Sequence, residues 1–177
     1  EDGIRYLVRS RGLGDVYKSQ SSLLLAAAIG LAAWTPLYAA AVRLMLRRNI
    51  AALGRGDMGP LLSSYADDVH FVFPGDNSWK ADLRGKDEVA RWVARFVRVG
   101  LRLEPQEILV TGPPWNTRMA LRFTDHLTLP DGTVVYENQG AMLGTIVWGK
   151  LAAYEVHEDT EKSAALDAWL AVHEPHS

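Results

Sequence analysis

Asp125 is the residue in this sequence whose type and setting best suit acid–base chemistry. It stands in a stretch from Trp115 to Leu129 in which apolar and polar residues alternate. Such alternation is typical of a β-strand with one buried face, and it puts Asp125 on the same face as Leu121 and Phe123. A carboxyl group buried among apolar side chains has a raised pKa and can exchange a proton near neutral pH. We therefore expect Asp125 to be a catalytic acid or base.

Two residues of the following strand are expected to share this space. Pro130-Asp131-Gly132 has the composition of a hairpin turn, so the stretch from Thr133 to Trp148 should run back beside the first strand. In the register that this turn suggests, Tyr136 and Asn138 project toward Asp125. The alternative is structural: the carboxylate bonds a neighbouring backbone group or pairs with an arginine.

Apolar, aromatic and polar side chains are predicted to line a pocket around this site. The predicted lining residues are Phe73, Trp79, Trp92, Phe96, Phe123, Tyr136, Asn138 and Met142. The large aromatic residues among them, together with Trp115, also suit plain packing in the core or at its rim, and this interpretation stays open.

Other motifs do not support rival chemistries. There is no cysteine, which excludes disulfides, thiolate nucleophiles and cysteine metal sites. The five histidines lack metal-ligand spacing, and we expect neither a metal nor a cofactor. The run from Gly54 to Gly59 matches a dinucleotide-binding pattern, but it follows a helix and has no strand before it. The net charge is −2 and no basic stripe interleaved with aromatic residues occurs, so no nucleic-acid partner is expected.

The elements that carry these residues are predicted from hydrophobic periodicity. Helices are predicted at Val42–Leu53, in a short segment begun by Asp57, at Asp87–Val99 and at Thr160–Val172; strands are predicted at Val69–Phe73, Leu101–Thr111, Trp115–Leu129, Thr133–Trp148 and Leu151–His157; and Gly75–Gly85 is predicted to be a loop. A long antiparallel sheet buries one face, and helices packed there bend it into a cone. The sequence therefore predicts an α+β fold whose mouth forms a small-molecule pocket.

Three segments, taken in their order and spacing, carry a family resemblance. They are Gly56-Asp57 with Leu61 to Val69 and Phe73-Pro74-Gly75; Gly85 to Val89; and Gly149-Lys150-Leu151 with Glu158 to Lys162. Together they cover about residues 42 to 172 and resemble the SnoaL-like family of the nuclear transport factor 2-like superfamily. The resemblance implies a cone-shaped fold and sheet-face homodimers. The family includes polyketide cyclases, ketosteroid isomerases, epoxide hydrolases and purely binding proteins.

The catalytic positions of these relatives are not matched here. The isomerase base would stand at Phe73, and the cyclase aspartate would stand at Met142. The epoxide hydrolase pattern needs Arg-x-Asp, but Arg122 and Asp125 are three residues apart and should point to opposite faces of a strand. Its second aspartate would stand at Val156. Asp125 is thus the carboxylate left for chemistry.

The N-terminal part is considered separately. Residues 10–20 resemble a translated sequencing adapter, and residues 1–20 are interpreted as such an artefact or as a disordered arm. Leu23–Val42 carries no charge and is as long as a bilayer-spanning helix, which needs ~20 residues. Arg43, Arg47 and Arg48 follow, which favours a membrane anchor with the domain in the cytoplasm. A signal peptide of a secreted protein, and an artefact or helix of a soluble cytoplasmic protein, are the alternatives for residues 21–41.

We therefore expect a SnoaL-like domain at residues 42–174 that binds a small apolar or cyclic molecule. Isomerase, cyclase or hydrolase activity centred on Asp125 is the first hypothesis. The second is a non-catalytic module of the same fold that forms a homodimer or binds a partner protein.

Overall fold

The computed structural model describes residues 36–173 of the chain. From Tyr38 onward the described residues pack into one compact unit. Residues 1–20 and most of the predicted apolar segment Leu23–Val42 lie outside the described range; residues 36–42 belong to a helix that ends at residue 53. Within residues 36–173, no helix is both long and apolar enough to cross a lipid bilayer.

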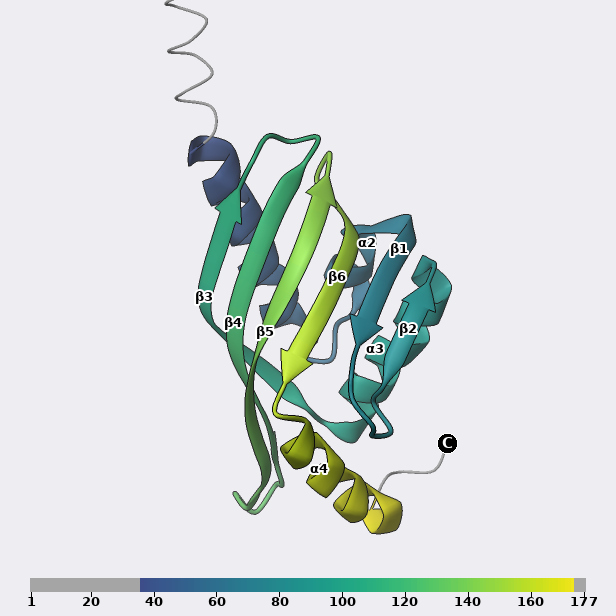
Figure 1. The fold of residues 1–177 in the computed structure, drawn as a ribbon. Coiled ribbons are helices and arrows are strands. Elements are labelled where there is room, and N and C mark those ends of the chain that lie inside the picture. The colour runs from purple at the N-terminus through teal and green to yellow at the C-terminus, as the bar shows by residue number, and fades with distance from the viewer. Residues whose placement is uncertain (1–35, 174–177) are drawn as a thin grey trace, which may run out of the picture. The chain divides into compact units, whose positions relative to one another are not determined.

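A curved, six-stranded sheet forms the frame of the unit (Figure 1). The strands are β1 (Tyr65–Phe73), β2 (Ala81–Arg84), β3 (Arg102–Thr111), β4 (Thr117–Thr128), β5 (Val134–Val147) and β6 (Lys150–Glu158), in the spatial order β2-β1-β6-β5-β4-β3. All neighbours are antiparallel except β1 and β6, which are parallel. The predicted α+β fold with a curved sheet is confirmed, with this one parallel pair added.

Three helices lie on one face of the sheet: the helix of residues 36–53, α2 (Gly59–Ser63) and α3 (Lys86–Val99) (Figure 1). The fourth, α4 (Thr160–His173), follows β6 and packs against β5 at the lower end of the sheet. Its start is fixed by Asp159, whose Oδ1 accepts the backbone N–H of Glu161 at 3.1 Å.

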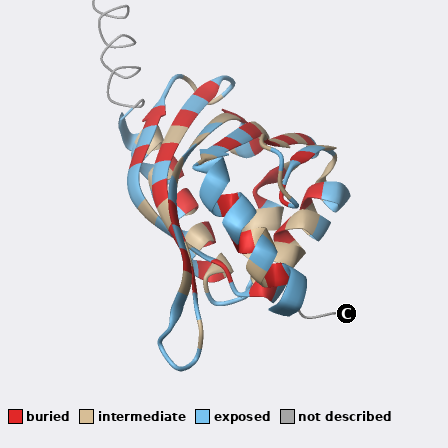
Figure 2. Ribbon diagram, turned by 60° about the horizontal axis from the view of Figure 1, so that its bottom comes forward, coloured by how far each residue is buried: buried red, intermediate tan, exposed pale blue. Residues whose placement is uncertain are grey.

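Side-chain alternation along β4 separates the core from the exposed face of the sheet. Buried and more exposed positions alternate along the strand (Figure 2). Met119, Leu121 and Phe123 are at most 4% exposed and face the helices, and Asp125 continues the same row. Because successive strand residues point to opposite faces, this row fixes the direction of Asp125.

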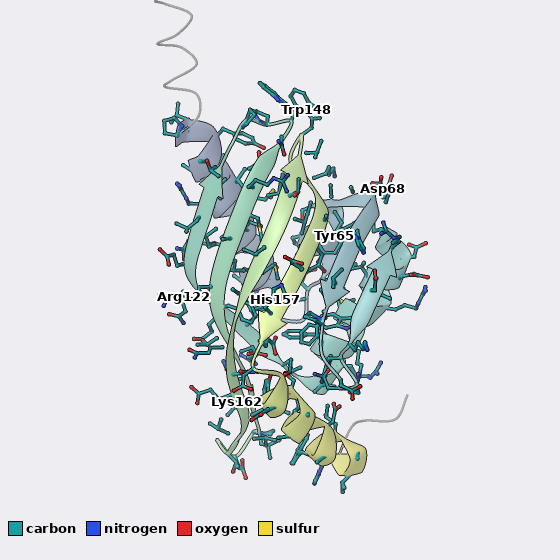
Figure 3. All side chains as sticks on the ribbon, viewed as in Figure 1. Tyr65, Asp68, Arg122, Trp148, His157 and Lys162 are labelled. Carbon is teal, nitrogen blue, oxygen red and sulfur yellow. The ribbon has the colours of Figure 1, made fainter. Side chains whose placement is uncertain are left out.

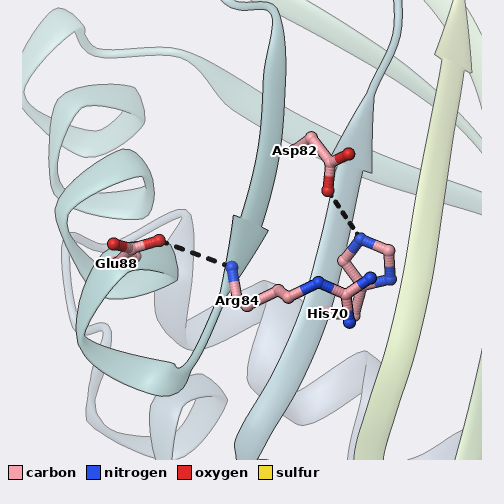
Figure 4. Close-up of polar contacts among 4 residues, drawn as sticks. All are labelled: His70, Asp82, Arg84 and Glu88. Atoms are coloured by element: carbon pink, nitrogen blue, oxygen red, sulfur yellow. Dashed lines mark hydrogen bonds and ion pairs between the residues drawn. The ribbon is translucent and has the colours of Figure 1, made fainter.

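The segment Gly75–Gly85, predicted to be a loop, contains β2. This four-residue strand has no apolar alternation long enough to mark it, and it forms through its pairing with the end of β1. On its exposed side His70 Nε2 lies 2.7 Å from Asp82 Oδ1, and the backbone N–H of Arg84 donates to Glu88 at 3.4 Å (Figure 4). The loop prediction was therefore wrong for residues 81–84, and β1 begins at Tyr65 rather than Val69.

Candidate functional site

The pairing of β4 with β5 brings three predicted site residues together. Asp125 lies opposite Asn138, and the neighbouring Leu127 lies opposite Tyr136. Asp125, Asn138 and Tyr136 are 3%, 2% and 6% exposed. Since directly paired residues of an antiparallel ladder project to the same face, all three side chains enter the interior from adjacent strands.

A second carboxyl group, Glu158, comes from the end of β6. It pairs with Gly140 of β5, one step beyond Asn138 on the same face. A Cβ atom at Gly140 would lie 2.9 Å from Glu158 Cγ and 2.7 Å from Phe123 Cζ. The absence of a side chain at Gly140 therefore gives Glu158 its place beside Tyr136 and Asn138.

Glu158 is held by several donors. The Tyr136 hydroxyl donates to Glu158 Oε2 at 3.1 Å, and the Ser163 hydroxyl of α4 donates to the same oxygen at 3.2 Å. Asn138 Nδ2 lies 3.3 Å from this oxygen, 2.9 Å from the Tyr136 hydroxyl oxygen and 3.0 Å from the backbone oxygen of Asp159. Donors directed at a carboxylate favour its ionised form.

The hydrogen bonding of Asp125 differs from that of Glu158. Its Oδ1 atom is buried and has no hydrogen-bond partner among residues 36–173. Burial raises the pKa of Asp125 to about 7, and the charge of Glu158 raises it in the same direction, while the Tyr136 hydroxyl and Lys162 lower it. Burial also raises the pKa of Glu158, although Tyr136, Ser163 and Asn138 oppose this. The two neighbouring carboxyls thus differ in environment: Glu158 accepts several hydrogen bonds that favour its ionised form, whereas burial favours the protonated form of Asp125.

Asp125 lines a small cavity of about 20 Å³. Tyr136, Glu158 and Ser163 line it too, as does Trp79, whose indole Nε1–H is buried without a partner. An unpaired donor and an unpaired acceptor therefore border one cavity. A space of this size holds one water molecule, which requires about 10–15 Å³ and at least two polar partners.

A larger apolar cavity of about 80 Å³ lies between the helices and the sheet. Leu46, Ile50 and Leu53 of the first helix form one wall, and Phe123 and Met142 of the sheet are part of another. Phe73, Trp92, Phe96 and Glu158 line both cavities. The polar cavity with Asp125 and the apolar cavity therefore adjoin each other.

Comparison with models of protein families identifies the family of this chain. A model of the SnoaL-like domain matches residues 46–154. The chain belongs to the SnoaL-like family. No curated protein matches this SnoaL-like chain.

Solved structures share the fold of the SnoaL-like chain at low sequence identity. A nuclear transport factor 2-like protein of unknown function from Burkholderia pseudomallei is 22% identical, covers 71% of this chain and 96% of its own, and has a TM-score of 0.60. Bal32a, from a soil-derived mobile gene cassette, is 16% identical, with 73% and 98% covered and a TM-score of 0.59. An epoxide hydrolase from Mycobacterium tuberculosis, described as LEH-like, is 15% identical, with 76% and 97% covered and a TM-score of 0.56. At these identities the likeness shows the fold alone.

Most of the residues of this SnoaL-like chain that were predicted to line a pocket line one or both of the two cavities. Phe73, Trp92 and Phe96 border both cavities, Trp79 and Tyr136 border the polar one, and Phe123 and Met142 border the apolar one. Asn138 was also predicted to line the pocket, but it lines neither of these two cavities and instead donates a hydrogen bond to the Tyr136 hydroxyl oxygen at 2.9 Å. Arg122 lies on the exposed face, where its Nε is 4.0 Å from Glu107 Oε2, so it points away from Asp125 as predicted (Figure 3).

Glu158 was missed by the sequence reasoning. The last strand was predicted to end at His157, one residue too early, and the second carboxylate was sought at Val156. Yet Tyr154, Val156 and Glu158 follow the two-residue alternation of a strand, and this was the signal that could have found it. Within residues 36–173 no group of three or more His, Cys, Asp or Glu side chains could hold a metal ion.

A cluster that joins α4, α3 and the loop between β1 and β2 surrounds Trp79, one of the residues that line the polar cavity. Asp167 of α4 accepts the backbone N–H and the hydroxyl of Ser78, both at 2.6 Å. Arg95 of α3 donates to the Ser78 backbone oxygen at 2.8 Å, and its guanidinium lies 4.1 Å from the centre of a Trp79 ring. This cluster of Ser78, Arg95 and Asp167, here called the loop clamp, fixes Trp79 against the cavity.

Proposed function

We propose that this protein is an acid–base enzyme that acts on a small apolar or cyclic molecule, with Asp125 as its catalytic residue. The observation that carries the proposal is the unpaired, buried Oδ1 of Asp125 bordering a polar cavity next to an apolar one. A pKa of about 7 suits a group that must both accept and donate a proton at neutral pH.

Hydrolysis fits the polar cavity better than isomerisation does. The cavity has room for one water molecule, with Asp125 Oδ1 as acceptor and the Trp79 indole N–H as donor. The Asp125 carboxylate takes a proton from this water while the water oxygen bonds to an electrophilic carbon of the substrate. The same carboxyl then returns the proton to the oxygen displaced from that carbon. Glu158, held by Tyr136 and Ser163, keeps a negative charge beside Asp125 and so maintains its raised pKa.

The size of the apolar cavity restricts the substrate. At about 80 Å³ it is well below the ~300–1,000 Å³ typical of pockets for drug-sized ligands. It is also smaller than the ~150 Å³ engineered cavity that binds benzene. A substrate of one small ring or a short branched chain fits this space with modest displacement of Leu46, Leu53 or Met142.

The test compares the wild-type protein with Asp125→Asn on two small substrates. Cyclohexene oxide reports hydrolysis through formation of the diol, and cyclohex-3-en-1-one reports isomerisation through the absorbance of its conjugated product. We expect diol formation by the wild-type protein and a loss of about 100-fold or more in Asp125→Asn. Asp68→Asn, which changes an exposed carboxylate, serves as the matched control. A wild-type protein that is inactive on both compounds and whose Asp125 titrates near pH 4 by NMR would refute the proposal.

The alternative is a non-catalytic module that pairs through the outer face of its sheet. Two observations favour it: the interior cavities are small, and a groove of about 840 Å³ crosses the sheet, with Leu109 and Leu143 in its lining. These leucines are 56% and 45% exposed, and apolar residues on an exposed sheet face indicate an association surface. A second copy of this chain is the partner that the alternative names.

We also propose, from the sequence alone, that Leu23–Val42 attaches the chain to a membrane with the domain on the cytoplasmic side. The support is the charge-free apolar run followed by Arg43, Arg47 and Arg48. Fractionation of cells that express the full chain, beside a chain lacking residues 21–41, tests this. Recovery of both forms in the same fraction would contradict it.

A further inference from the structure

The apolar cavity contains polar groups that the acid–base site does not use. Asn49, on the first helix, lines the cavity and is 5% exposed. Its Nδ2 atom is buried, and no hydrogen-bond partner for it lies in the part of the chain that the structure describes. Leaving a buried amide donor unpaired costs about 1–3 kcal/mol, so a side chain of this kind is expected to have an acceptor when the protein is in its working state.

A pair of buried tyrosines presents a second donor to the same cavity. Tyr65 and Tyr154 both line it, and their hydroxyl oxygens lie 2.9 Å apart. Each hydroxyl has one proton, and one hydrogen bond between them uses only one of the two. Burial raises the pKa of Tyr65 to about 12, so its hydroxyl remains neutral and keeps its proton at physiological pH.

The hydrogen-bond donors and acceptors in the cavity wall indicate which polar group a ligand should carry. Within the described residues, Asn49 Nδ2 and the second hydroxyl proton of the tyrosine pair have no acceptor, whereas most of the cavity wall is apolar. An apolar molecule without heteroatoms would leave both donors unpaired. A molecule with a hydroxyl group as its only polar group would add a further donor. A carbonyl or ether oxygen supplies acceptor capacity alone.

We propose that the apolar cavity selects molecules that combine a small hydrocarbon frame with one acceptor oxygen, as in a ketone or a cyclic ether, and that Asn49 is the residue that determines this specificity. The inference rests on the proposed function only in placing the ligand next to Asp125. Asp125 itself does not line this cavity, so binding can be tested separately from chemistry.

Two compounds of nearly the same shape test the proposal. Cyclopentanone has a carbonyl oxygen where methylenecyclopentane has a CH₂ group. The chain has four methionines, and Met142 lines the cavity, so ¹³C-methyl methionine spectra provide a local reporter of binding. We expect the wild-type protein to bind the ketone about tenfold more tightly than the hydrocarbon, the effect of one hydrogen bond worth about 1.4 kcal/mol.

Variants assign the preference to a residue. Asn49→Leu keeps the approximate volume and removes the donor, and we expect it to abolish the preference for the ketone. Ile50→Val changes the neighbouring wall without changing polarity and should retain the preference. Tyr65→Phe removes one hydroxyl of the tyrosine pair and should reduce the preference in part, which keeps the test valid if Asn49→Leu does not fold. Asp125→Asn should bind both compounds as the wild-type protein does.

Three results would overturn the inference: equal affinities of the wild-type protein for the two compounds, an unchanged preference in Asn49→Leu, or no shift of the Met142 methyl with either compound. A protein that retains the preference, but is inactive on both test substrates and has an Asp125 that titrates near pH 4, would refute the acid–base function and leave the binding specificity intact.

Discussion

Asp125, which is buried, and the half-buried Glu158 are neighbouring carboxyls whose hydrogen bonding makes them chemically different. Glu158 accepts hydrogen bonds from Tyr136 and Ser163, whereas Asp125 Oδ1 accepts none. The negative charge therefore resides first on Glu158, and its field adds to burial in raising the pKa of Asp125. Burial of Asp125 is thus the main cause of its raised pKa, and the charge of Glu158 is the second.

This difference predicts a pH dependence of stability. The pKa of Asp125 is about 7 in the folded protein and 3.8 as its ordinary value, so the folded protein keeps a proton that the unfolded chain releases. The free energy of unfolding should consequently fall as the pH rises from about 4 to about 7, and level off above that, with a total loss on the order of 4 kcal/mol. Urea denaturation at pH 4 and pH 8 measures it.

Asp125→Asn should remove most of this slope because an amide does not titrate. The slope that persists belongs to Glu158, whose pKa is also raised. Asp68→Asn provides the control, since Asp68 is exposed and should leave the wild-type slope intact. Equal slopes in the wild-type protein and Asp125→Asn would show that Asp125 is ionised at low pH in the folded state.

The direction of individual side chains was predictable where a long strand fixed it. The alternation on β4 predicted the inward direction of Asp125, and the hairpin turn predicted that Tyr136 and Asn138 would follow. Asn49 escaped notice because the helix was described by its apolar stripe, although it lies three residues after Leu46 and seven after Val42, on the same side. A polar residue at a position that the helical spacing places among buried apolar residues indicates a candidate site residue, and only its position in the sequence reveals it.

At the scale of elements, α4 has two tasks. Ser163 in its first turn contacts Glu158, and Asp167 one turn later holds Ser78 in the loop between β1 and β2. Through this loop clamp, α4 keeps Trp79 in place over the polar cavity. One helix therefore both holds Glu158 through Ser163 and holds the loop that carries Trp79 through Asp167.

Asp167→Asn should loosen the loop without unfolding the domain. The clamp is exposed, so its loss should cost no more than about 1 kcal/mol in overall stability. The local effect should be larger: amide hydrogen exchange of residues 76–80 should become faster, while exchange in β4 and β5 stays the same. Hydrogen exchange with mass spectrometry measures both.

Glu161→Gln is the matched control, because Glu161 lies in the first turn of the same helix and its carboxylate makes no contact with Ser78. If Asp167→Asn and Glu161→Gln show the same exchange at residues 76–80, the loop is held by Trp79 packing and not by the clamp.

The helices and strands that could be predicted from the sequence are those whose own residues carry a clear periodic pattern. The helix α3 has a clear apolar stripe and ends at Gly100, whose φ of 90° favours glycine, and it was predicted within one residue. By contrast, β2 forms through its hydrogen-bonded pairing with the edge of β1. The parallel pairing of β1 with β6 likewise joins residues about 80 positions apart in the sequence. Such long-range pairings depend on the assembled sheet and leave no local pattern.

At the scale of the whole molecule, the two faces of the sheet suit different functions. The inner face, with the helices, encloses cavities of about 80 and 20 Å³, whereas the outer face opens to a groove of about 840 Å³. The acid–base proposal uses the first face and the pairing alternative uses the second. The two are compatible in one protein, because none of the described residues lines both the groove and the polar cavity.

The outer face can be tested through the state of association. Leu143 lies on β5 near the middle of the sheet order and is 45% exposed, so a charge at this position would be buried if two sheets met face to face. We expect Leu143→Glu to shift a wild-type dimer to the monomer in sedimentation equilibrium, because an unpaired buried carboxylate costs several kcal/mol. Val134→Glu is the control: Val134 is 57% exposed at the start of β5, next to the hairpin turn and away from the groove. A wild-type protein that stays monomeric at millimolar concentration, or a dimer that Leu143→Glu leaves intact, would exclude this face as the pairing surface and leave the enclosed cavities as the functional part of the molecule.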